Sequence, residues 1–266
     1  MSKSLRYGII GCGVIGPWHA RSVALVDGAE LVACCDVIPE KVEKFAAEYG
    51  GQTYTDYKKM LAEAKLDIVS ICTPSGLHAE MAICAAENGV NVLSEKPLDI
   101  SDPAMTRMIK TCREKGVKLA CIFQRRTSPL WMKVREIVQT GKLGKMVLGD
   151  AYLKYYRSPE YYASADWRGT WKLDGGGALM NQGVHCVDLV QWIMGPVKSV
   201  TAYAAPLVRK IEVEDTSVAI LKYASGAFGV IQGTTSVCPG MNHRLEFHGE
   251  FGTLRVEGEK IVELRS

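Results

Sequence analysis

Short apolar runs alternate with longer amphipathic stretches through the first half of the chain. The apolar runs predict five strands: LRYGII, AELVACCD, LDIVSICTP, VNVLSEKP and VKLACIF. The stretches between them repeat their apolar residues at helical spacing, which predicts helices over residues 14–26, 39–49, 77–89 and 101–115. Strands and helices in this alternation predict a parallel sheet with helices on both faces, as in a doubly wound α/β domain.

The pattern changes after a further helix, predicted over residues 129–140. From KMVLGDAYLKYY onward the polar and apolar residues alternate, and later strands are predicted at VKSVTAYAA, DTSVAILKYA, GAFGVIQGTT, HRLEFHG and GTLRVEG. A hairpin turn is predicted at Ser225-Gly226. These features predict an α+β domain with a mostly antiparallel sheet. We place the boundary near residue 125, which gives domains 1–125 and 126–266.

A glycine-rich turn, GIIGCGVIG, directly follows the first strand. Gly11 allows a tight turn, Gly13 lets the backbone approach a pyrophosphate, and Gly16 allows close packing of helix on strand. The diphosphate is then expected against the helix amino terminus, beside the intervening residues Cys12, Val14 and Ile15. A plain turn between strand and helix is the alternative reading of these glycines.

Asp36 favours the dinucleotide interpretation. It stands 20 residues after Gly16, at the carboxyl end of the second predicted strand. There its carboxylate can accept hydrogen bonds from ribose hydroxyls. The negative charge disfavours a 2′-phosphate, and the next residues, Val37 and Ile38, supply no arginine. The predicted cofactor is therefore NAD rather than NADP.

A second glycine-rich stretch, GGGALMNQGVHCVDLVQWIMG, spans residues 175–195. It follows a polar, aromatic loop rather than a buried strand, and its apolar residues recur at helical spacing. On one continuous helix Asn181, His185 and Asp188 share a face. The stretch is therefore expected to present side chains, and its glycines to let the helix start close to another backbone or a ligand.

Composition restricts the remaining classes of function. A net charge of +3, with no run of lysine or arginine, gives no nucleic-acid footprint. No apolar run is long enough to cross a bilayer. The nine scattered cysteines form no C-x-x-C pair, which favours reduced thiols and a cytoplasmic location. His185 with Asp188 or Cys186 lacks a third ligand at suitable spacing, so no metal site is expected.

Four motifs, GIIGCGVIG, CTPSGLH, SEKPL and GGGALMNQGVHCVD, occur in an order that resembles the Gfo/Idh/MocA oxidoreductases. The resemblance implies a Rossmann domain followed by an α/β substrate domain with a large open sheet. In relatives this sheet often forms the dimer interface, so a homo-oligomer is expected. Relatives usually continue past the strand near Ile261 with more strand and a closing helix. Either this chain is a short variant or the sequence stops early, and the second domain is then incomplete at its carboxyl end.

The resemblance also implies roles for particular residues. Glu95 and Lys96 match the E-K pair where nicotinamide and substrate meet, Pro97 follows in what relatives often hold as a cis peptide, and His185 matches the active-site histidine. Further cofactor contacts are expected from Thr73, Pro74, His78, Gln124, Trp167 and Arg168. Substrate contacts are expected from Lys96, Arg125, Tyr155, Trp171, Asn181 and His185. Arg125 could grip a phosphate or carboxylate, or form a solvated pair with Arg126, and the aromatic residues could stack on a sugar ring or serve ordinary packing.

The implied reaction moves a hydride between a secondary alcohol and nicotinamide, and a base must handle the hydroxyl proton. Lys96 is the first candidate for that base and His185 the second. Lysine would need its pKa lowered from about 10.4. If Lys96 stays charged, it can polarise the oxygen while His185 takes the proton.

The substrate class is expected to be a sugar, sugar derivative, nucleotide-sugar or cyclitol. Inositol dehydrogenases carry aspartate where this chain has Asn181, which points away from inositol and towards nucleotide-sugars. Two other readings stay open. One is an enzyme that recycles tightly bound NAD in sugar–sugar oxidoreduction, elimination or hydrolysis; the other is a non-catalytic NAD-binding sensor.

Overall fold

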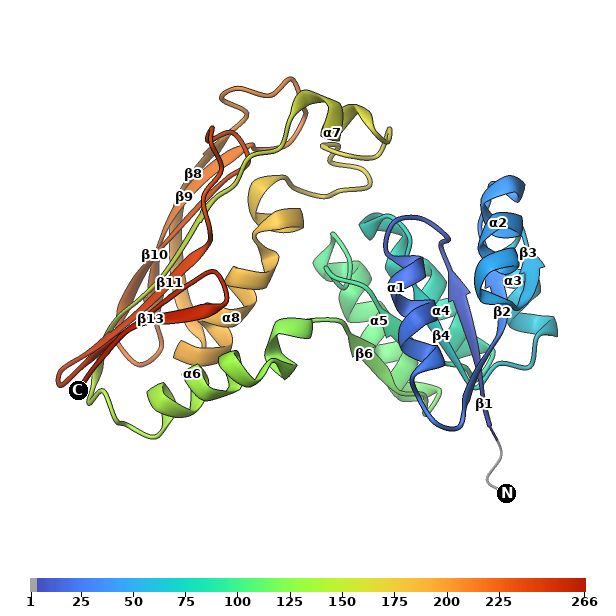
Figure 1. The fold of residues 1–266 in the computed structure, drawn as a ribbon, viewed down its shortest axis with the longest axis horizontal. Coiled ribbons are helices and arrows are strands. Elements are labelled where there is room, and N and C mark those ends of the chain that lie inside the picture. The colour runs from blue at the N-terminus through green and yellow to red at the C-terminus, as the bar shows by residue number, and fades with distance from the viewer. Residues whose placement is uncertain (1–3) are drawn as a thin grey trace. The chain divides into compact units, whose positions relative to one another are not determined.

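The computed structural model describes residues 4–266 and divides into two compact units, residues 1–122 and 123–266 (Figure 1). We call them the Rossmann unit and the sheet unit. The division lies between Ile122 and Phe123, whereas the sequence pattern placed the boundary near residue 125. Within residues 4–266, none of the helices combines the length and apolar character needed to span a membrane.

The Rossmann unit contains a six-stranded sheet in the order β3-β2-β1-β4-β5-β6, with every neighbouring pair parallel. Its strands are β1 Leu5–Ile10, β2 Ala29–Cys35, β3 Gln52–Tyr54, β4 Ile68–Ile71, β5 Asn91–Ser94 and β6 Leu119–Cys121. The chain order reverses direction between β1 and β4. In open parallel sheets this reversal opens a crevice at the carboxyl ends of the strands, where ligands bind.

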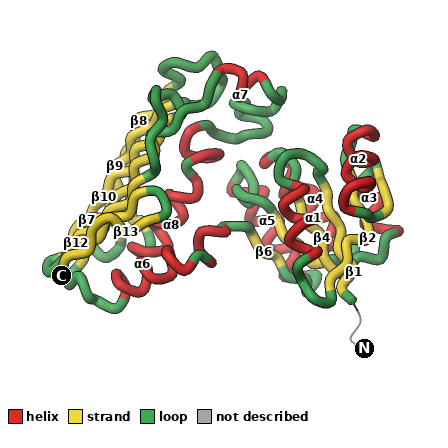
Figure 2. The backbone as a smooth tube through the Cα atoms, in the orientation of Figure 1, coloured by secondary structure: helices red, strands yellow, loops and turns green. Residues whose placement is uncertain are grey.

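Helices cover both faces of this sheet, as the sequence pattern predicted (Figure 2). On one face, α1 (Gly16–Ala24) and α2 (Pro39–Tyr49) bury Val23 and Phe45 against β1 and β2. On the other, α3 (Tyr57–Glu63), α4 (His78–Glu87) and α5 (Asp102–Glu114) bury Met60, Ala82 and Met108. Ser101 caps α5 by accepting a hydrogen bond from the Ala104 N–H.

Two elements of this unit were not predicted, β3 and α3. The strand β3 lies at the edge of the sheet, directly after two glycines. Its three residues are too few to show an alternation of polar and apolar side chains. The helix α3 has seven residues, although Asp56 caps it by accepting from the Lys58 N–H at 2.8 Å. The predicted sheet was therefore one strand too narrow.

The sheet unit contains seven strands in the order β13-β12-β11-β7-β10-β9-β8. Their bounds are β7 Met146–Lys154, β8 Val197–Ala205, β9 Thr216–Tyr223, β10 Phe228–Thr234, β11 Arg244–Gly249, β12 Thr253–Glu257 and β13 Lys260–Arg265. Strands β7 and β10 are parallel and the other neighbours are antiparallel, which confirms the mostly antiparallel prediction. The turn between β9 and β10 contains Gly226 at φ +93°, as the predicted hairpin requires.

Two long helices, α6 (Pro129–Gln139) and α8 (Val184–Met194), pack on one face of this sheet (Figure 1). Their buried side chains include Trp131 and Leu189, which share a core with Phe247 of β11. The sheet unit also contains the 3-10 helix η2 (Gln124–Thr127), α7 (Pro159–Ala163) and the π-helical turn η3 (Ala178–Gln182). The 3-10 helix η1 (Ser75–Leu77) belongs to the Rossmann unit.

The helix expected across the second glycine segment is interrupted. Residues 178–182 form the π-helical turn η3, and α8 begins only at Val184. Gly177 directly precedes this turn, and a Cβ there would lie 1.7 Å from the Glu214 carbonyl oxygen. The glycine thus permits the close approach to another backbone that the sequence suggested. The prediction of one continuous helical face for Asn181, His185 and Asp188 was wrong, since Asn181 precedes α8.

Candidate active site

The first glycine turn divides its three glycines between two tasks. Added Cβ atoms would lie 2.5 Å from the Cys72 carbonyl oxygen at Gly11 and 2.6 Å from the Gly11 carbonyl oxygen at Gly16. Gly11 also adopts φ +99°, which side chains disfavour. A Cβ at Gly13, in contrast, would meet nothing within 4 Å among the described residues. Gly11 and Gly16 serve the protein's own packing, and Gly13 leaves its backbone open to a ligand.

The start of α1 fits a diphosphate. No side chain of the described chain caps this helix, and its first turn carries no acidic residue. Pro17 lies in that first turn, where its missing N–H has no intrahelical acceptor to lose. Val14 and Ile15 are exposed beside it. The uncapped N–H groups and the helix dipole favour an anion here.

Asp36 lies directly after β2 and holds the glycine turn in place. Its Oδ2 accepts from the Cys12 N–H at 2.9 Å, and its Oδ1 accepts from the Ile38 N–H at 3.0 Å. Carboxylate oxygens can accept further hydrogen bonds, so both remain able to receive ribose hydroxyls. Together with the glycine turn, Asp36 fits the adenosine half of NAD.

His78 connects the two loops that follow β4 and β5. Its Nε2 lies 2.9 Å from the Thr73 carbonyl oxygen and its Nδ1 2.8 Å from the Pro97 carbonyl oxygen. Burial lowers the pKa of His78, so the neutral ring donates to one carbonyl at a time. Asp99 adds a second connection by accepting from the Ala79 N–H at 2.9 Å. The buried His78 side chain therefore links the two loops that border the cofactor crevice.

Glu95 and Lys96 follow β5 at the same edge of the sheet. Glu95 is buried, and its Oε2 accepts from the Lys96 N–H at 3.1 Å. Burial raises the pKa of the Glu95 carboxyl, but hydrogen bonds from His19 and from the Lys96 N–H outweigh it and hold the pKa below its usual value. Lys96 is half-buried and precedes a cis peptide bond to Pro97, as the resemblance implied.

In the sheet unit, His185 lies in the first turn of α8 with its ring edge-on to Phe123, at 6.3 Å between ring centroids. Asn181 donates from its amide nitrogen to Asp174 Oδ1 at 2.6 Å. Asp174 is buried and also accepts from the Gly169 N–H at 2.9 Å. The Asp174 carboxylate is therefore hydrogen-bonded to the Asn181 side chain. The sequence analysis missed Asp174, although its place immediately before the glycine segment was a usable signal.

Arg168 contacts two aromatic rings. Its guanidinium lies 4.7 Å from the Trp167 ring centroid and 4.4 Å from that of Tyr161. Its Nη1 also donates to the Tyr161 hydroxyl at 2.6 Å. These two cation–π contacts and the hydrogen bond fix the orientation of the arginine. Trp171, in contrast, is exposed and is held through its backbone N–H by Glu212.

Arg125 and Arg126 do not form the solvated pair that was one reading of the sequence. Arg125 donates from Nη1 to His243 Nε2 at 2.9 Å, and Arg126 binds the Asp188 carboxylate through two nitrogens. Burial, reinforced by the Arg125 charge, lowers the pKa of His243 to about 4, so the ring is neutral and accepts. Within the sheet unit, Arg125 is therefore hydrogen-bonded to a histidine and Arg126 is paired with a carboxylate.

Pro74 directly precedes η1 in the Rossmann unit, and two further predicted residues, Tyr155 and Gln124, lie near Arg125 in space or in sequence. Burial, reinforced by Cys186, raises the pKa of Tyr155 to about 12, which keeps it a neutral phenol beside the Arg125 side chain. Gln124 is exposed at the start of the short helix that precedes α6. The structure therefore groups Tyr155, Arg125 and Cys186 in the sheet unit and leaves Gln124 on its surface.

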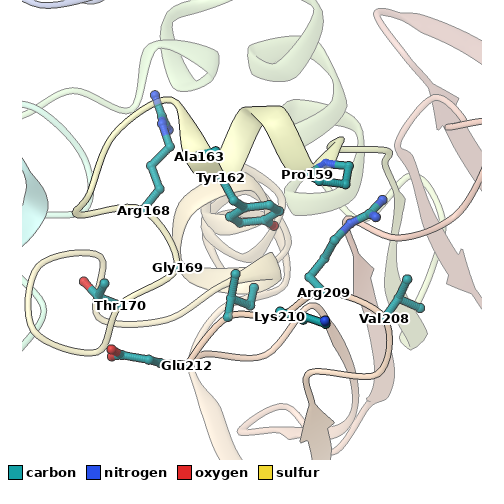
Figure 3. A pocket seen from close by; sticks show the side chains of 11 residues that line it. Pro159, Tyr162, Ala163, Arg168, Gly169, Thr170, Val208, Arg209, Lys210 and Glu212 are labelled. Atoms are coloured by element: carbon teal, nitrogen blue, oxygen red, sulfur yellow. The ribbon is translucent and has the colours of Figure 1, made fainter.

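A cavity of about 540 Å³ lies beneath α7 in the sheet unit. Its lining includes Tyr162, Arg168, Thr170, Arg209, Lys210 and Glu212. Figure 3 shows the Arg168 and Arg209 guanidinium groups on opposite sides of the Tyr162 ring, with Lys210 below it. The three cations outnumber the one carboxylate. The cavity therefore favours an anionic ligand.

A group of possible metal ligands was also absent from the sequence predictions. Ligand atoms of Asp150, Glu246 and His248 lie within 4.8 Å of one another on the sheet face away from α6 and α8. Glu246 is already paired with Arg244 at 2.8 Å and with Arg255 at 3.2 Å. These two arginines balance the negative charge of Glu246, so the carboxylate does not need a metal ion for charge compensation.

Models of known families match both units. The model described as an oxidoreductase family with an NAD-binding Rossmann fold matches residues 5–123. The model of the GFO/IDH/MocA C-terminal domain matches residues 131–255. The chain belongs to the Gfo/Idh/MocA family of NAD-dependent oxidoreductases.

Individual members of the Gfo/Idh/MocA family resemble the whole chain. It is 30% identical over 270 residues to the inositol 2-dehydrogenase of Rhizobium meliloti, covering 98% of this chain and 78% of the relative. The WlbA dehydrogenase of Bordetella pertussis, solved with NADH and UDP-GlcNAcA, is 39% identical with a TM-score of 0.97. That of Chromobacterium violaceum, with the same two ligands, is 34% identical with a TM-score of 0.96. Both comparisons cover 100% of this chain and 78% of the other.

The division of labour among the glycines predicts two different defects. Gly13→Ala should weaken NADH binding at least about tenfold with an unchanged melting temperature, because only the ligand approaches that Cα closely. Gly16→Ala should lower the melting temperature as well, because its Cβ would collide with the Gly11 carbonyl. Fluorescence titration with NADH and thermal unfolding of both variants make the comparison. Equal thermal losses would contradict it.

Proposed function

We propose that this protein oxidises a secondary alcohol of a nucleotide-sugar, with NAD as the hydride acceptor. The observation that carries the proposal is the position of Lys96, at the same carboxyl edge of the Rossmann sheet as a glycine turn and an Asp36 that fit NAD. Sugar, cyclitol and nucleotide-sugar dehydrogenases are represented among its relatives. The two similar structures described above, which hold UDP-GlcNAcA, share 39% and 34% identity with this chain and favour the nucleotide-sugar.

When bound, NAD supplies the hydride acceptor at its nicotinamide ring. The protein supplies alignment and the group that handles the hydroxyl proton. Lys96 is the first candidate: as a neutral amine it removes the proton, and as an ammonium it polarises the oxygen while His185 removes it. The Glu95 carboxylate accepts a hydrogen bond from the Lys96 N–H and thereby fixes the backbone position from which the Lys96 side chain extends.

The cavity of the sheet unit is the proposed site for the diphosphate of the substrate. Asp215 accepts from three successive N–H groups, those of Leu207, Val208 and Arg209, at 3.0, 2.8 and 2.6 Å. Burial raises the pKa of Asp215, but these hydrogen bonds outweigh it and keep the pKa low, so the carboxylate holds the loop in one shape. The loop thereby presents Arg209 and Lys210 to the cavity before a ligand arrives.

The open face of the seven-stranded sheet is proposed to join two copies of the chain. Strand register places Leu148, Val218, Ile220 and Phe228 on the same face, opposite the helices. All four are exposed. An apolar surface of this kind marks an association site. A second copy is the occupant expected for the Gfo/Idh/MocA family, because the resemblance implies a dimer through this sheet.

The role of Lys96 predicts a selective loss of turnover. Lys96→Ala should lower NADH production from a nucleotide-sugar by at least about a thousandfold, because it removes the group that handles the proton. The affinity for NADH should change little. A panel of sugars, cyclitols and UDP-sugars with NAD, followed at the NADH absorbance, identifies the substrate first. Lys110→Ala, on the exposed side of α5, is the control.

The diphosphate assignment predicts a substrate-specific defect at the cavity. Lys210→Ala should raise the KM for a UDP-sugar about tenfold, equivalent to ~1.4 kcal/mol, because a charge-assisted contact is lost. The value of kcat and the affinity for NADH should be unchanged. Lys260→Ala, an exposed lysine on β13, should have no effect on KM. An unchanged KM in Lys210→Ala removes the cavity from the substrate site.

The interface assignment is tested by charges on opposite faces of neighbouring strands. Ile220→Glu should convert the oligomer to monomers, since it buries a carboxylate in the proposed contact. Val200→Glu is the matched control, because Val200 is 57% exposed against 58% for Ile220 and pairs with the inward-facing Leu221. Sedimentation velocity distinguishes the species. Equal behaviour of the two variants contradicts the assignment.

A further inference from the structure

A chain of four hydrogen-bonded side chains lies inside the Rossmann unit and ends at Glu95. The Tyr7 hydroxyl is 2.6 Å from Ser70 Oγ, which is 2.7 Å from His19 Nδ1. His19 Nε2 is 2.9 Å from Glu95 Oε1. All four residues are buried, with exposed fractions from 0% at Ser70 to 9% at His19. They come from β1, β4, α1 and the end of β5, so the fold assembles them from separate segments.

The protons of this chain can be placed without leaving a polar atom unmatched. Tyr7 can donate to Ser70, Ser70 to His19 Nδ1, and His19 from Nε2 to Glu95. Burial raises the pKa of Tyr7, which therefore keeps the proton that this arrangement needs. Every donor points towards the carboxylate. Hydrogen bonds in series strengthen one another and favour the ionised form of the final acceptor.

The other carboxylate oxygen of Glu95 connects this series of hydrogen bonds to Lys96, the proposed proton-handling residue. Glu95 Oε2 accepts from the Lys96 N–H at 3.1 Å, so each oxygen of the carboxylate has its own task. His19 holds one oxygen, and the second holds the main chain of the proposed proton-handling residue. A rotation of the carboxylate that broke the first contact would also disturb the second.

The titratable neighbours of Glu95 in the Rossmann unit do not replace His19. Cys72 at the end of β4 has its pKa raised by burial and by Glu95, and remains a neutral thiol. The Cys121 thiol donates to the Glu95 carbonyl oxygen at 3.8 Å. His78 is neutral because burial lowers its pKa, and Asp99 is directed at main-chain N–H groups. The Lys96 charge also lowers the pKa of Glu95, less than the hydrogen bond from His19 does.

We propose that His19, backed by Ser70 and Tyr7, is a positioning residue that keeps Glu95 ionised and oriented, and thereby fixes Lys96 for proton transfer. The proposal rests on the function assigned above to Lys96. It gives the buried histidine of α1 a role in turnover, although His19 lies in the first helix after the glycine turn. His19 acts through Glu95 and is not itself a catalytic residue.

The test removes the donor at Glu95 and reads the carboxyl directly. In His19→Leu the Glu95 pKa should rise by about one to two units, because a buried carboxylate loses a charge-assisted hydrogen bond. Carbon-13 NMR of glutamate-labelled protein measures it, and Glu95→Gln assigns the signal. His19→Gln places an amide donor near the same oxygen and should restore the lower pKa. Turnover should fall about tenfold in His19→Leu and recover in His19→Gln.

A double-mutant cycle separates action through Glu95 from general damage. In the Glu95→Gln background, His19→Leu should cause less than about a twofold further loss of kcat, because residues that act through one another are not additive. Losses that multiply overturn the proposal. So does a Glu95 pKa that stays the same in His19→Leu.

Ser70→Ala provides a milder variant if His19→Leu does not fold. It removes only the hydroxyl beside Nδ1 and should raise the Glu95 pKa by a smaller amount in the same direction. Ser22→Ala is the matched control, because Ser22 lies on the same helix as His19 and its hydroxyl donates to the Trp18 carbonyl. Equal Glu95 pKa values in these two variants overturn the proposal.

The NMR titration needs no substrate, which separates this inference from the proposed function. If Lys96→Ala retains full turnover, the role of Lys96 falls, and with it the claim that His19 serves proton transfer. If Lys96→Ala is inactive and Glu95 titrates normally in His19→Leu, only the positioning role of His19 falls.

Discussion

The close contact between the first glycine turn and the end of β4 is the constraint on which the cofactor crevice depends. At Gly11 even a single Cβ would meet the Cys72 carbonyl at 2.5 Å. This approach brings the loops after β1 and β4 together at the point where the strand order reverses. Asp36 then ties the turn to β2, and His78 ties the loop after β4 to that after β5. The crevice is therefore defined by main-chain positions held by buried side chains.

Much of this arrangement could be predicted from the sequence, because its signals are local. The glycine spacing, the distance to Asp36 and the alternation of strand and helix each lie within a single supersecondary unit. The family resemblance added Lys96 and His185, which periodicity could not have selected. It also added the open sheet. The short edge strand β3 escaped because three residues carry no usable period.

Most of the missed features depend on contacts between distant parts of the chain. Asp174 is the exception, because it lies seven positions from Asn181, but no propensity signals the π-helical turn between them. The pairing of His19 with Glu95 joins residues 76 positions apart. Arg125 and His243 lie 118 positions apart, so the sequence could not distinguish a solvated arginine from one held inside the unit. Local patterns identified the types of residue, and the tertiary fold decided their partners.

Glu214 has a consequence for how the sheet unit responds to a ligand. Its two carboxylate oxygens accept from the Gly177 and Leu179 N–H groups at 2.9 and 3.1 Å, in the turn that leads into the helix of His185. One residue later, Asp215 grips the loop that carries Arg209 at the cavity. Glu214 and Asp215 are adjacent in the sequence. The loop that lines the cavity and the turn that precedes the helix of His185 are therefore held by the same segment of backbone. Under the proposed function, this shared support sets the distance between the cavity that receives the diphosphate and the His185 side chain, so substrate length becomes a condition for turnover.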